Sequence, residues 1–353
     1  MADQEDDDFF AGVCEALAAE GRFRVLDRIS RGAFGTVVRA KPRGGGPEVA
    51  IKCMRLGPND DGRTIAREIL HHEKLLHAHV VRFRECFAAG PFLCIAMELV
   101  PGGDLLELVN STRGLPENEA RYLFQQLILA VDYCHRMGVM NRDIKPENTL
   151  LLRVEGKPPM VKLCDFGYAK SLEDSAPTTR AGTMHYVAPE VLANYRRSVY
   201  DGMKADVWSC GVLLYVTLFC AFPFAVEAAG GGQAAEAQQM HEMLRRMARG
   251  EFSFPNYRSV SGECKDLIRH MLDPEHTKRF SVEDIKQHPW FLRNLLPGTL
   301  AYNDRVLTIP RVPPQSEEEV QRVIDQVLAG SQSSHISGEG FDALQSDDED
   351  DMI

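Results

Sequence analysis

A stretch in the middle of the chain, NRDIKPENTL (residues 141–150), combines an acid, a lysine and an amide side chain. Asp143 and Asn148 lie five residues apart with Lys145 between them, and VKLCDFG supplies a further acid, Asp165. Mg²⁺ prefers oxygen ligands, typically one or two carboxylates together with substrate phosphates. We therefore predict that Asn148 and Asp165 hold Mg²⁺. Asp143 is predicted to accept a substrate hydroxyl proton, and Lys145 to neutralise a transferring phosphoryl group.

Upstream, the segment ISRGAFGTV places Gly32 and Gly35 between two strand candidates. Glycines let a hairpin backbone come close to a ligand without intervening side chains. Ser30 stands where the GxGxxG pattern has its first glycine. An ordinary glycine-rich hairpin is therefore at least as good an interpretation of this loop taken alone.

The lysine that ends the next apolar strand, Lys52 in VAIK, has two interpretations. Such a lysine usually reaches along the surface into solvent. If it points into a cleft instead, it needs an anion, and Glu68 on the following helix is the available partner. The pair would hold the lysine where it can grip ATP phosphates.

The elements that must position these residues change character along the chain. Before residue 100 we expect strands in FRVLDRI, GTVVRA, EVAIKCM, VVRFRECFA and FLCIAMELV, a helix in TIAREILHHEKLLHA, and a short apolar helix after the acidic start. After Pro101 the candidates are helical: DLLELV, ENEARYLFQQLILAVDYCHRM, DVWSCGVLLYVTLFC, QQMHEMLRRMARG and ECKDLIRHML. This order predicts two lobes with a cleft at a hinge near residue 100. Residues 226–239, rich in Ala, Gly and Gln, indicate a flexible insertion.

Composition excludes several classes of protein. The chain has 353 residues, 44% of them hydrophobic and 26% charged, and no apolar run is long enough to cross a membrane. Its net charge of −11 argues against a nucleic-acid surface. The start of the sequence is acidic, unlike a secretory or transit peptide, and the nine cysteines form no CxxC pair. We expect a monomer with reduced thiols in the cytoplasm and nucleus.

Seven motifs in order, RGAFGTV, VAIK, REIL, NRDIKPEN, DFG, APE and DVWSCGV, resemble those of eukaryotic protein kinases over about residues 22–292. The resemblance implies an α+β bilobal fold, with a small β-rich lobe over about 22–99 and a larger helical lobe over about 100–292. KPEN and GTMHYVAPE further resemble Ser/Thr kinases. The implied cofactors are ATP and Mg²⁺. The implied ATP-binding residues are Ser30, Gly32, Gly35, Val37, Ala50, Lys52, Glu68, Met97, Glu98, Val100 and Leu150.

The segments CDFGYAKS, AREILHHEKLLHAHVVRF and QSEEEVQRVIDQV, with the acidic tail, resemble the second subfamily of plant and algal sucrose-nonfermenting-related kinases. This similarity implies a role in osmotic, nutrient or hormone stress signalling, an upstream activating kinase, and a type 2C protein phosphatase as a possible partner. Calcium-dependent and calmodulin-dependent kinases share much of the core. They are disfavoured because no EF-hand pattern is present and residues 317–328 are acidic.

Between DFG and APE the chain offers several hydroxyl side chains. We expect Arg142 to lie buried near this segment, where a phosphate could pair with it and order the loop. The resemblance points to Ser175 and Thr179 as phosphosites, and to Thr183 as a substrate-side residue contacting Asp143. Ordinary loop hydroxyls are the alternative.

The C-terminal extension, residues 293–329, contains a predicted amphipathic helix over 316–328, with Ser316 at the N-cap and Glu319 at the third position. Its apolar face comprises Val320, Val323, Ile324, Val327 and Leu328. In the resembling family this helix packs on the helix that here bears Glu68, which would favour the active conformation. Both ends of the chain, residues 1–21 and 330–353, are acidic. The second has the composition of a disordered tail, which is either a solvating segment or a phosphatase-docking segment.

Asn141 departs from the family pattern, in which a histidine stacks under the phenylalanine of DFG. With Ser30 it supports an alternative, a pseudokinase scaffold. Against this alternative, the chain retains the residues whose loss usually marks an inactive kinase: Lys52, Glu68, Asp143, Asn148 and Asp165. His72 is predicted to be a polar member of the packed column that includes the phenylalanine of DFG. For substrates, Asp104 and Glu147 favour an arginine three residues before the target, and Val216 in place of a further acid keeps that preference moderate.

Overall fold

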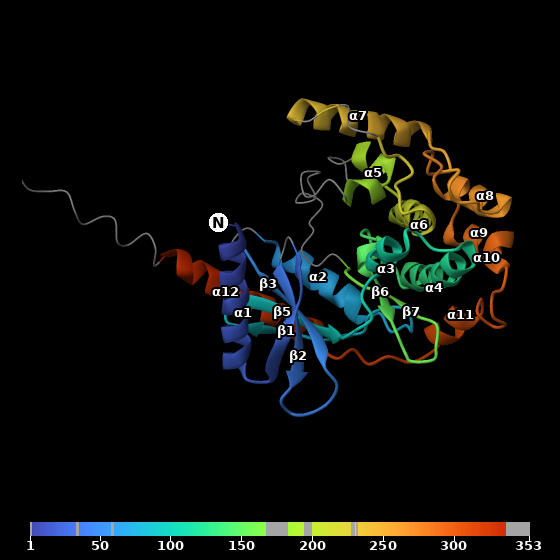
Figure 1. Ribbon diagram of the computed structural model, residues 1–353. Coiled ribbons are helices and arrows are strands. Elements are labelled where there is room, and N and C mark those ends of the chain that lie inside the picture. The colour runs from blue at the N-terminus through green and yellow to red at the C-terminus, as the bar shows by residue number, and fades with distance from the viewer. Residues whose placement is uncertain are drawn as a thin grey trace, which may run out of the picture. The chain divides into compact units, whose positions relative to one another are not determined.

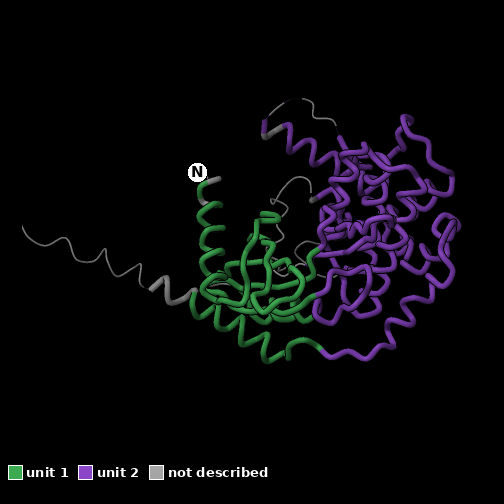
Figure 2. Tube along the Cα trace, turned by 60° about the horizontal axis from the view of Figure 1, so that its bottom comes forward, with its two compact units in different colours: residues 1–70, 83–99, 313–353 green, residues 71–82, 100–312 purple. Residues whose placement is uncertain are grey.

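The computed structural model describes residues 2–32, 35–57, 60–166, 183–193, 200–226, 230 and 232–336. The chain divides into two compact units, coloured in Figure 2. Unit 1 comprises Met1–Leu70, Phe83–Leu99 and Pro313–Ile353, and unit 2 comprises His71–Arg82 and Val100–Val312. Unit 1 contains a sheet and unit 2 is mainly helical, as the sequence predicted.

Unit 1 is built on a five-stranded antiparallel sheet in the order β1-β2-β3-β5-β4. Its strands are β1 (Phe23–Gly32), β2 (Gly35–Pro42), β3 (Val49–Arg55), β4 (Phe83–Ala89) and β5 (Phe92–Glu98). They correspond to the five predicted strands. Burial alternates along β2: Val38 and Ala40 are buried, and their neighbours are half-buried or exposed. One face of the strand therefore packs on the core.

The N-terminal helix α1 (Ala2–Glu20) is longer than the short apolar helix expected there, because it includes the acidic run. Acidic residues in a first turn interact favourably with the helix dipole. Val13 and Leu17 are fully buried against the sheet, in a core shared with Cys53 and Cys94. The helix is thus an integral part of unit 1 (Figure 1).

The second helix, α2 (Gly62–Glu73), ends earlier than the periodic run that predicted it. Beyond Glu73 the backbone N–H of Leu75 bonds the carbonyl of His72, and that of Leu76 bonds the Tyr133 hydroxyl. The apolar residues after the helix therefore satisfy their backbone groups through a turn and a tyrosine instead of a further helical turn.

Unit 2 is mainly helical. Its helices are α3 (Leu105–Thr112), α4 (Glu117–Arg136), α5 (Pro189–Ala193), α6 (Gly202–Phe219), α7 (Gln233–Arg249), α8 (Gly262–Met271), α9 (Val282–Gln287), α10 (Pro289–Leu292) and α11 (Tyr302–Leu307). Two short 3₁₀ helices, η1 (Pro146–Asn148) and η2 (Thr183–Tyr186), and the hairpin β6 (Thr149–Leu152) and β7 (Met160–Leu163) complete it. Helix α6 is buried nearly all round, as its uniformly apolar sequence requires.

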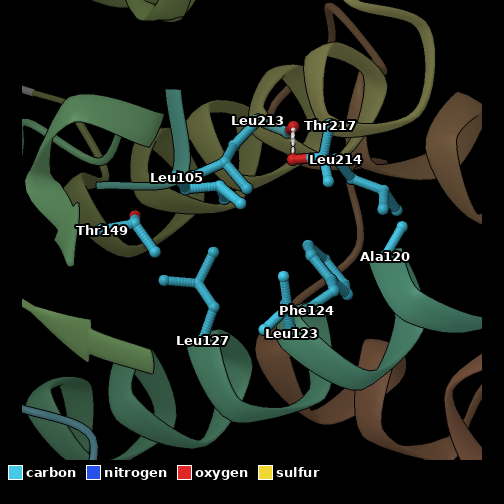
Figure 3. Close-up of a pocket in the computed structure, with 9 residues that line it drawn as sticks. All are labelled: Leu105, Ala120, Leu123, Phe124, Leu127, Thr149, Leu213, Leu214 and Thr217. Atoms are coloured by element: carbon cyan, nitrogen blue, oxygen red, sulfur yellow. Dashed lines mark hydrogen bonds between the residues drawn. The ribbon is translucent and has the colours of Figure 1, made fainter. Parts of the chain in front are cut away.

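A small apolar space between α3, α4 and α6 belongs to this core (Figure 3). It is lined mainly by leucines and has no room for a water molecule. The two hydroxyls on its lining are both satisfied: Thr217 bonds the carbonyl of Leu213 at 2.8 Å, and Thr149 that of Lys145 at 3.0 Å. The space is therefore packing, and Thr149 ties the loop that contains Lys145 to the core.

The expectation of a flexible insertion over residues 226–239 is wrong for residues 233–239. Residues 233–239 form the start of α7, whose Met243 and Met247 are buried. Alanine and glutamine are good helix formers, so this composition extends the helix once its far end is anchored. Residues 227–229 and 231 lie outside the described residues.

Helix α12 (Glu317–Ile336) belongs to unit 1 and is longer than predicted. The capping box is present: Ser316 N–H donates to Glu319 Oε2 at 2.7 Å, and Glu319 N–H donates to Ser316 Oγ at 3.2 Å. Residues 330–336, expected in a disordered tail, continue the helix because no proline interrupts it. The rest of the predicted tail, 337–353, lies outside the described residues.

Val320, Ile324 and Val327 of α12 are fully buried, and the helix packs against β4 and β5. Ile324 and Leu328 also lie over Gly62 at the start of α2, where even an added Cβ would meet them at 3.0–3.1 Å. The predicted amphipathic face thus has the surface that it requires. Within the described part of the chain, no helix is long and apolar enough to span a bilayer.

Candidate active site

The loop between α4 and β6 gathers the predicted catalytic side chains. Lys145 Nζ donates to both carboxylate oxygens of Asp143, at 3.0 and 2.8 Å. Asn148 Nδ2 donates to Asp143 Oδ2 at 2.8 Å and to its carbonyl oxygen at 2.9 Å. Asp143 is only 9% exposed. The carboxylate is therefore held in one orientation by a cation and an amide.

The asparagine predicted to hold the metal and the DFG aspartate come from adjacent segments. Cys164, next to Asp165, donates its N–H to the Asn148 carbonyl at 3.0 Å. Asp165 has φ of +54°, a left-handed conformation that is uncommon for a non-glycine residue. Such backbone conformations cost free energy and cluster at functional sites.

Asn141 joins the same two segments. Its Nδ2 donates to the carbonyl oxygen of Asp165 at 3.1 Å, and its Oδ1 accepts from the N–H of Asp143 at 3.2 Å. Asn141 is 2% exposed, so both hydrogen bonds are shielded from water. The Asn141 amide therefore ties the segment of Asp143 to that of Asp165.

Phe166, the residue after Asp165, takes part in an aromatic stack. His72 and Phe166 have ring centroids 4.8 Å apart and an interplanar angle of 28°. His72 Nε2 also contacts the carbonyl oxygen of Val81 at 2.7 Å. The histidine is thus a polar member of a packed column, as predicted, with its ring orientation set by a backbone partner.

Sequence reasoning gave no role to Asp206, although its motif DVWSCGV was part of the resemblance. This fully buried carboxylate accepts the N–H of Asn141 at 3.0 Å and that of Arg142 at 2.9 Å, and it contacts His135 Nε2 at 2.9 Å. Arg142 has φ of +64°. Asp206 therefore holds the strained start of the catalytic loop in place.

A second missed element is the ion pair between Glu190 of APE and Arg279. The pair is bidentate, with Nη1–Oε1 at 2.7 Å and Nη2–Oε2 at 2.8 Å, and Arg279 is fully buried over the Trp208 ring. Nothing near Arg279 in the sequence marks it. Only its position beside α5 and α6 shows that it anchors the APE segment.

Arg142 differs from the prediction, because its side chain is exposed instead of buried. A guanidinium keeps its hydration unless an anion is brought to it, since burying an unpaired charge is costly. The predicted phosphosites Ser175 and Thr179 lie outside the described residues. Thr183 starts η2, and its side chain is likewise outside them.

Five of the predicted ATP-binding residues share one face of the unit 1 sheet. Ser30 pairs with Val37, Val37 pairs with Lys52, and Ala50 pairs with Met97. Residues directly opposite each other point to the same face, as do residues two apart in a strand, such as 50 and 52. The register alone therefore gathers these side chains.

The remaining ATP-binding residues lie at element ends or on a helix. Gly32 and Gly35 pair with each other at the end of the β1–β2 hairpin. Gly35 has φ of +149°, and a Cβ there would lie 2.1 Å from the carbonyl oxygen of Cys53, so only glycine fits. The others are Glu68 on α2, Glu98 at the end of β5, Val100 after it, and Leu150 in β6.

The substrate-side acids differ in their surroundings. Asp104 caps α3 by accepting the N–H of Glu107 at 2.8 Å, and partial burial raises its pKa despite that bond. Glu147 is exposed, and Val216 is buried in α6. Asp104 therefore has a structural role as the N-cap of α3, and its predicted contact with substrate stays a prediction.

Comparison with known proteins agrees with this geometry. A family model described as the protein kinase domain matches residues 23–291. Serine/threonine-protein kinase SRK2B of Arabidopsis thaliana is 38% identical over 323 residues, covering 90% of this chain and 85% of the relative. SRK2A of Physcomitrium patens is 37% identical, covering 92% and 90%. SAPK4 of Oryza sativa subsp. japonica is 37% identical, covering 89% and 85%.

Among solved structures, the crystal structure of Rad53 1-466 in complex with AMP-PNP is similar, with a TM-score of 0.63 and 30% identity. The match covers 78% of this chain and 66% of that chain, just under two thirds of its length. The predicted α+β kinase fold, with a β-sheet lobe and a helical lobe, is thereby confirmed.

Proposed function

We propose a mechanism from the premise that this chain belongs to the protein kinase family and is an ATP-dependent Ser/Thr protein kinase, related to the second subfamily of plant sucrose-nonfermenting-related kinases. One observation carries the assignment of roles. Asp143 is held by Lys145 and Asn148, within a segment tied by backbone hydrogen bonds to that of Asp165. These groups are the parts that phosphoryl transfer requires.

In this mechanism Asp143 orients the hydroxyl of the protein substrate and accepts its proton. Lys145 balances the charge of the phosphoryl group during transfer. Because Asn148 Nδ2 is engaged by Asp143, the Asn148 Oδ1 atom is left as a possible metal ligand. Asn148 Oδ1 and the Asp165 carboxylate would hold Mg²⁺, since both are oxygen donors of the kind that this ion prefers, and the ion would neutralise phosphate charge.

For ATP, the shared face of Ser30, Val37, Ala50 and Met97 is proposed to cover the nucleotide, with Lys52 positioned for its phosphates. Glu68 is proposed to orient Lys52. The close approach of the Gly35 backbone to Cys53 favours a tight hairpin of the kind that covers phosphates in kinases.

For substrates, we propose a moderate preference for arginine at the third position before the target. Exposed Glu147 supports it, and the half-buried carboxylate of Asp104 at the start of α3 is proposed as the second acid. Apolar Val216 supports the moderate strength of the preference.

For regulation, we propose phosphorylation of Ser175 and Thr179 by an upstream kinase, with exposed Arg142 available to the new phosphate. An exposed guanidinium is accessible to an incoming phosphate. We further propose that α12 biases the enzyme toward its active conformation, because Ile324 and Leu328 pack over Gly62 at the start of α2. Similarity to plant kinases supports a stress-signalling role. We also propose a monomer in the cytoplasm and nucleus, with a type 2C phosphatase as a partner.

The test is Mg·ATP-dependent transfer of phosphate to an Arg-x-x-Ser peptide and to the matched Ala-x-x-Ser peptide. Activity should be absent in Asp143→Asn and several-fold greater with the arginine peptide. No transfer to either peptide, even after treatment with an activating kinase, would favour the pseudokinase scaffold that Ser30 and Asn141 suggest. Equal transfer to both peptides would remove the arginine preference only.

A further inference from the structure

Helix α1 precedes the residues that match the kinase model, yet it is firmly docked on unit 1. The rings of Phe9 and Phe92 meet edge to face with centroids 5.3 Å apart. Gly12 also faces the Phe92 ring, which an added Cβ would meet at 3.7 Å. With the buried Val13 and Leu17, these contacts fix the helix on one face of the unit 1 sheet (Figure 1). Burial of several large apolar side chains makes this docking a stable feature.

The acidic end of the helix holds two arginines of β1. Asp6 Oδ2 accepts from Arg28 Nη1 at 2.9 Å, and Asp6 Oδ1 pairs with Arg31 Nε at 3.0 Å. The Asp6 side chain is only 12% exposed. Phe10 lies under the Arg28 guanidinium at 5.1 Å, and the more exposed Asp7 approaches the same group at 3.9 Å. One carboxylate thus uses both oxygens to bridge two positions of one strand.

A local irregularity in the strand makes this bridge possible. Residues three apart in a regular strand point to opposite faces, so Arg28 and Arg31 should not reach one carboxylate. However, Arg28 pairs with Val38 while Ser30 pairs with Val37, which marks a β-bulge between them. The extra residue shifts the alternation by one and turns both arginines toward Asp6.

The bridge lies near the hairpin end of an edge strand. β1 is an edge strand, hydrogen-bonded only to β2 among the described strands. Its last residue, Gly32, pairs with Gly35 at the hairpin end, one position after Arg31. Near its hairpin end, β1 is therefore held by its pairing with β2 and by the ion pairs of Arg28 and Arg31 with Asp6 of α1.

We propose that Asp6 is a positioning residue for ATP binding: by bridging Arg28 and Arg31, it holds the end of the β1–β2 hairpin in its nucleotide-covering position. This inference rests on the proposed role of that hairpin. If the hairpin samples other positions, the apparent affinity for ATP falls by the fraction of molecules that remain competent. Asp6 makes no contact with Asp143 or Lys145 among the described interactions, so the chemical step should be unaffected.

The first test compares Asp6→Asn with Asp8→Asn in the full-length protein. Asp8 is an exposed carboxylate on the same helix whose only described partner is Gln4, so it controls for the loss of charge. We expect Asp6→Asn to raise KM for ATP about threefold to tenfold with kcat unchanged, since two partly exposed ion pairs are lost. Asp8→Asn should match the wild type in both constants.

The second test places Asp6→Asn in an Arg28→Gln/Arg31→Gln background. The carboxylate has no arginine to hold there, so the substitution should change KM for ATP by less than about 1.5-fold. Equal effects in both backgrounds, an unchanged KM, or a parallel fall in kcat would overturn the proposal. A lower KM would overturn it as well, because it would mean that Asp6 acts by opposing phosphate charge.

A third measurement does not depend on catalysis. Asp6→Asn should speed amide hydrogen exchange at residues 28–32 and 36–38 by about threefold to tenfold, relative to residues 49–55 of β3. If the wild-type protein transferred no phosphate but the exchange effect appeared, the kinase mechanism would fail while the anchoring role stood. Unchanged exchange would overturn the anchoring role whatever the activity.

Discussion

Asn141 and Asp165 are joined by a hydrogen bond, from the Asn141 amide nitrogen to the Asp165 carbonyl oxygen at 3.1 Å. The same side chain accepts the N–H of Asp143 at 3.2 Å, so one amide fixes two backbone positions next to the predicted proton acceptor and metal ligand. Removing a buried amide that satisfies two partners is destabilising, because both partners then lack a hydrogen bond. Replacing it with another hydrogen-bonding side chain is better tolerated. This explains how a kinase can function with asparagine where its family usually has histidine.

Replacing Asn141 with histidine should leave kcat equal to that of the wild type or up to about fivefold higher. A ring nitrogen can still donate to the Asp165 carbonyl, and the ring adds aromatic surface of the kind that Phe166 uses in stacking on His72. The measurement is steady-state transfer to the Arg-x-x-Ser peptide at saturating ATP. A loss of more than tenfold would show that the amide itself is required.

The companion variant Asn141→Ala should lose about tenfold or more in kcat. Alanine cannot bond the Asp143 N–H or the Asp165 carbonyl, and both groups then sit unsatisfied in a buried site. Activity equal to the wild type in this variant would mean that the amide does not position the catalytic loop.

Asp206→Asn should lower the free energy of unfolding by about 2–4 kcal/mol and reduce kcat at least tenfold. The carboxylate accepts two backbone N–H groups and contacts His135, whereas an amide offers a single acceptor oxygen. Urea denaturation and peptide kinetics measure the two effects.

The matched control for this variant is Asp201→Asn on the same helix. Asp201 caps α6 by accepting from the N–H groups of Met203 and Lys204, and asparagine is an equally good N-cap. Its stability should change by less than about 0.5 kcal/mol. Equal losses in both variants would assign the effect to charge removal instead of the catalytic-loop contacts.

Ile324→Ala in α12 should cost about 2–4 kcal/mol of stability, because Ile324 is fully buried among β4, β5 and the start of α2. Gln326→Ala, at an exposed position of the same helix, should cost less than about 0.5 kcal/mol. Thermal unfolding compares the two. If α12 also biases activity, Ile324→Ala will lose kcat at temperatures where it remains folded, and an unchanged kcat would reject that role.

The free energy of unfolding should fall in acid because of two histidines of unit 2, His77 and His79. Burial lowers the pKa of His77 to about 3, with the nearby His79 charge as a smaller cause, and burial lowers the pKa of His79 to about 4. In the unfolded chain both pKa values are near 6.5. Below that pH the unfolded state binds more protons, so stability falls as the pH drops, by up to about 1.4 kcal/mol per pH unit for each histidine.

His77→Gln is the test of this dependence. His77 Nε2 contacts Asn303 Oδ1 at 3.0 Å, and a glutamine amide can donate to the same oxygen without titrating. Between about pH 6.5 and 4 the unfolding free energy of this variant should fall less steeply than that of the wild type, by about one proton of uptake. Identical slopes in urea denaturation at several pH values would contradict the prediction.

The helices and strands were predicted well where a periodic pattern coincided with a packed face, as in β2, α4 and the capped start of α12. Their ends were predicted less well. Helix α2 stops at Glu73 although its apolar spacing continues, and α12 runs on to Ile336 although its composition turns polar. In both cases the end depends on which partners the backbone finds after the periodic segment, and local spacing does not contain that information.

The sequence by itself determined the chemistry of this protein, because Asp143, Lys145 and Asn148 lie within one loop whose spacing already limits what they can do. The tertiary structure decided what holds that loop. Asp206 reaches Asn141 across 65 residues of chain, and Arg279 reaches Glu190 across 89. Asp6 likewise meets Arg28 and Arg31 only because a helix docks beside a bulged edge strand. Such contacts depend on how distant elements pack, and no local pattern of residue types specifies them.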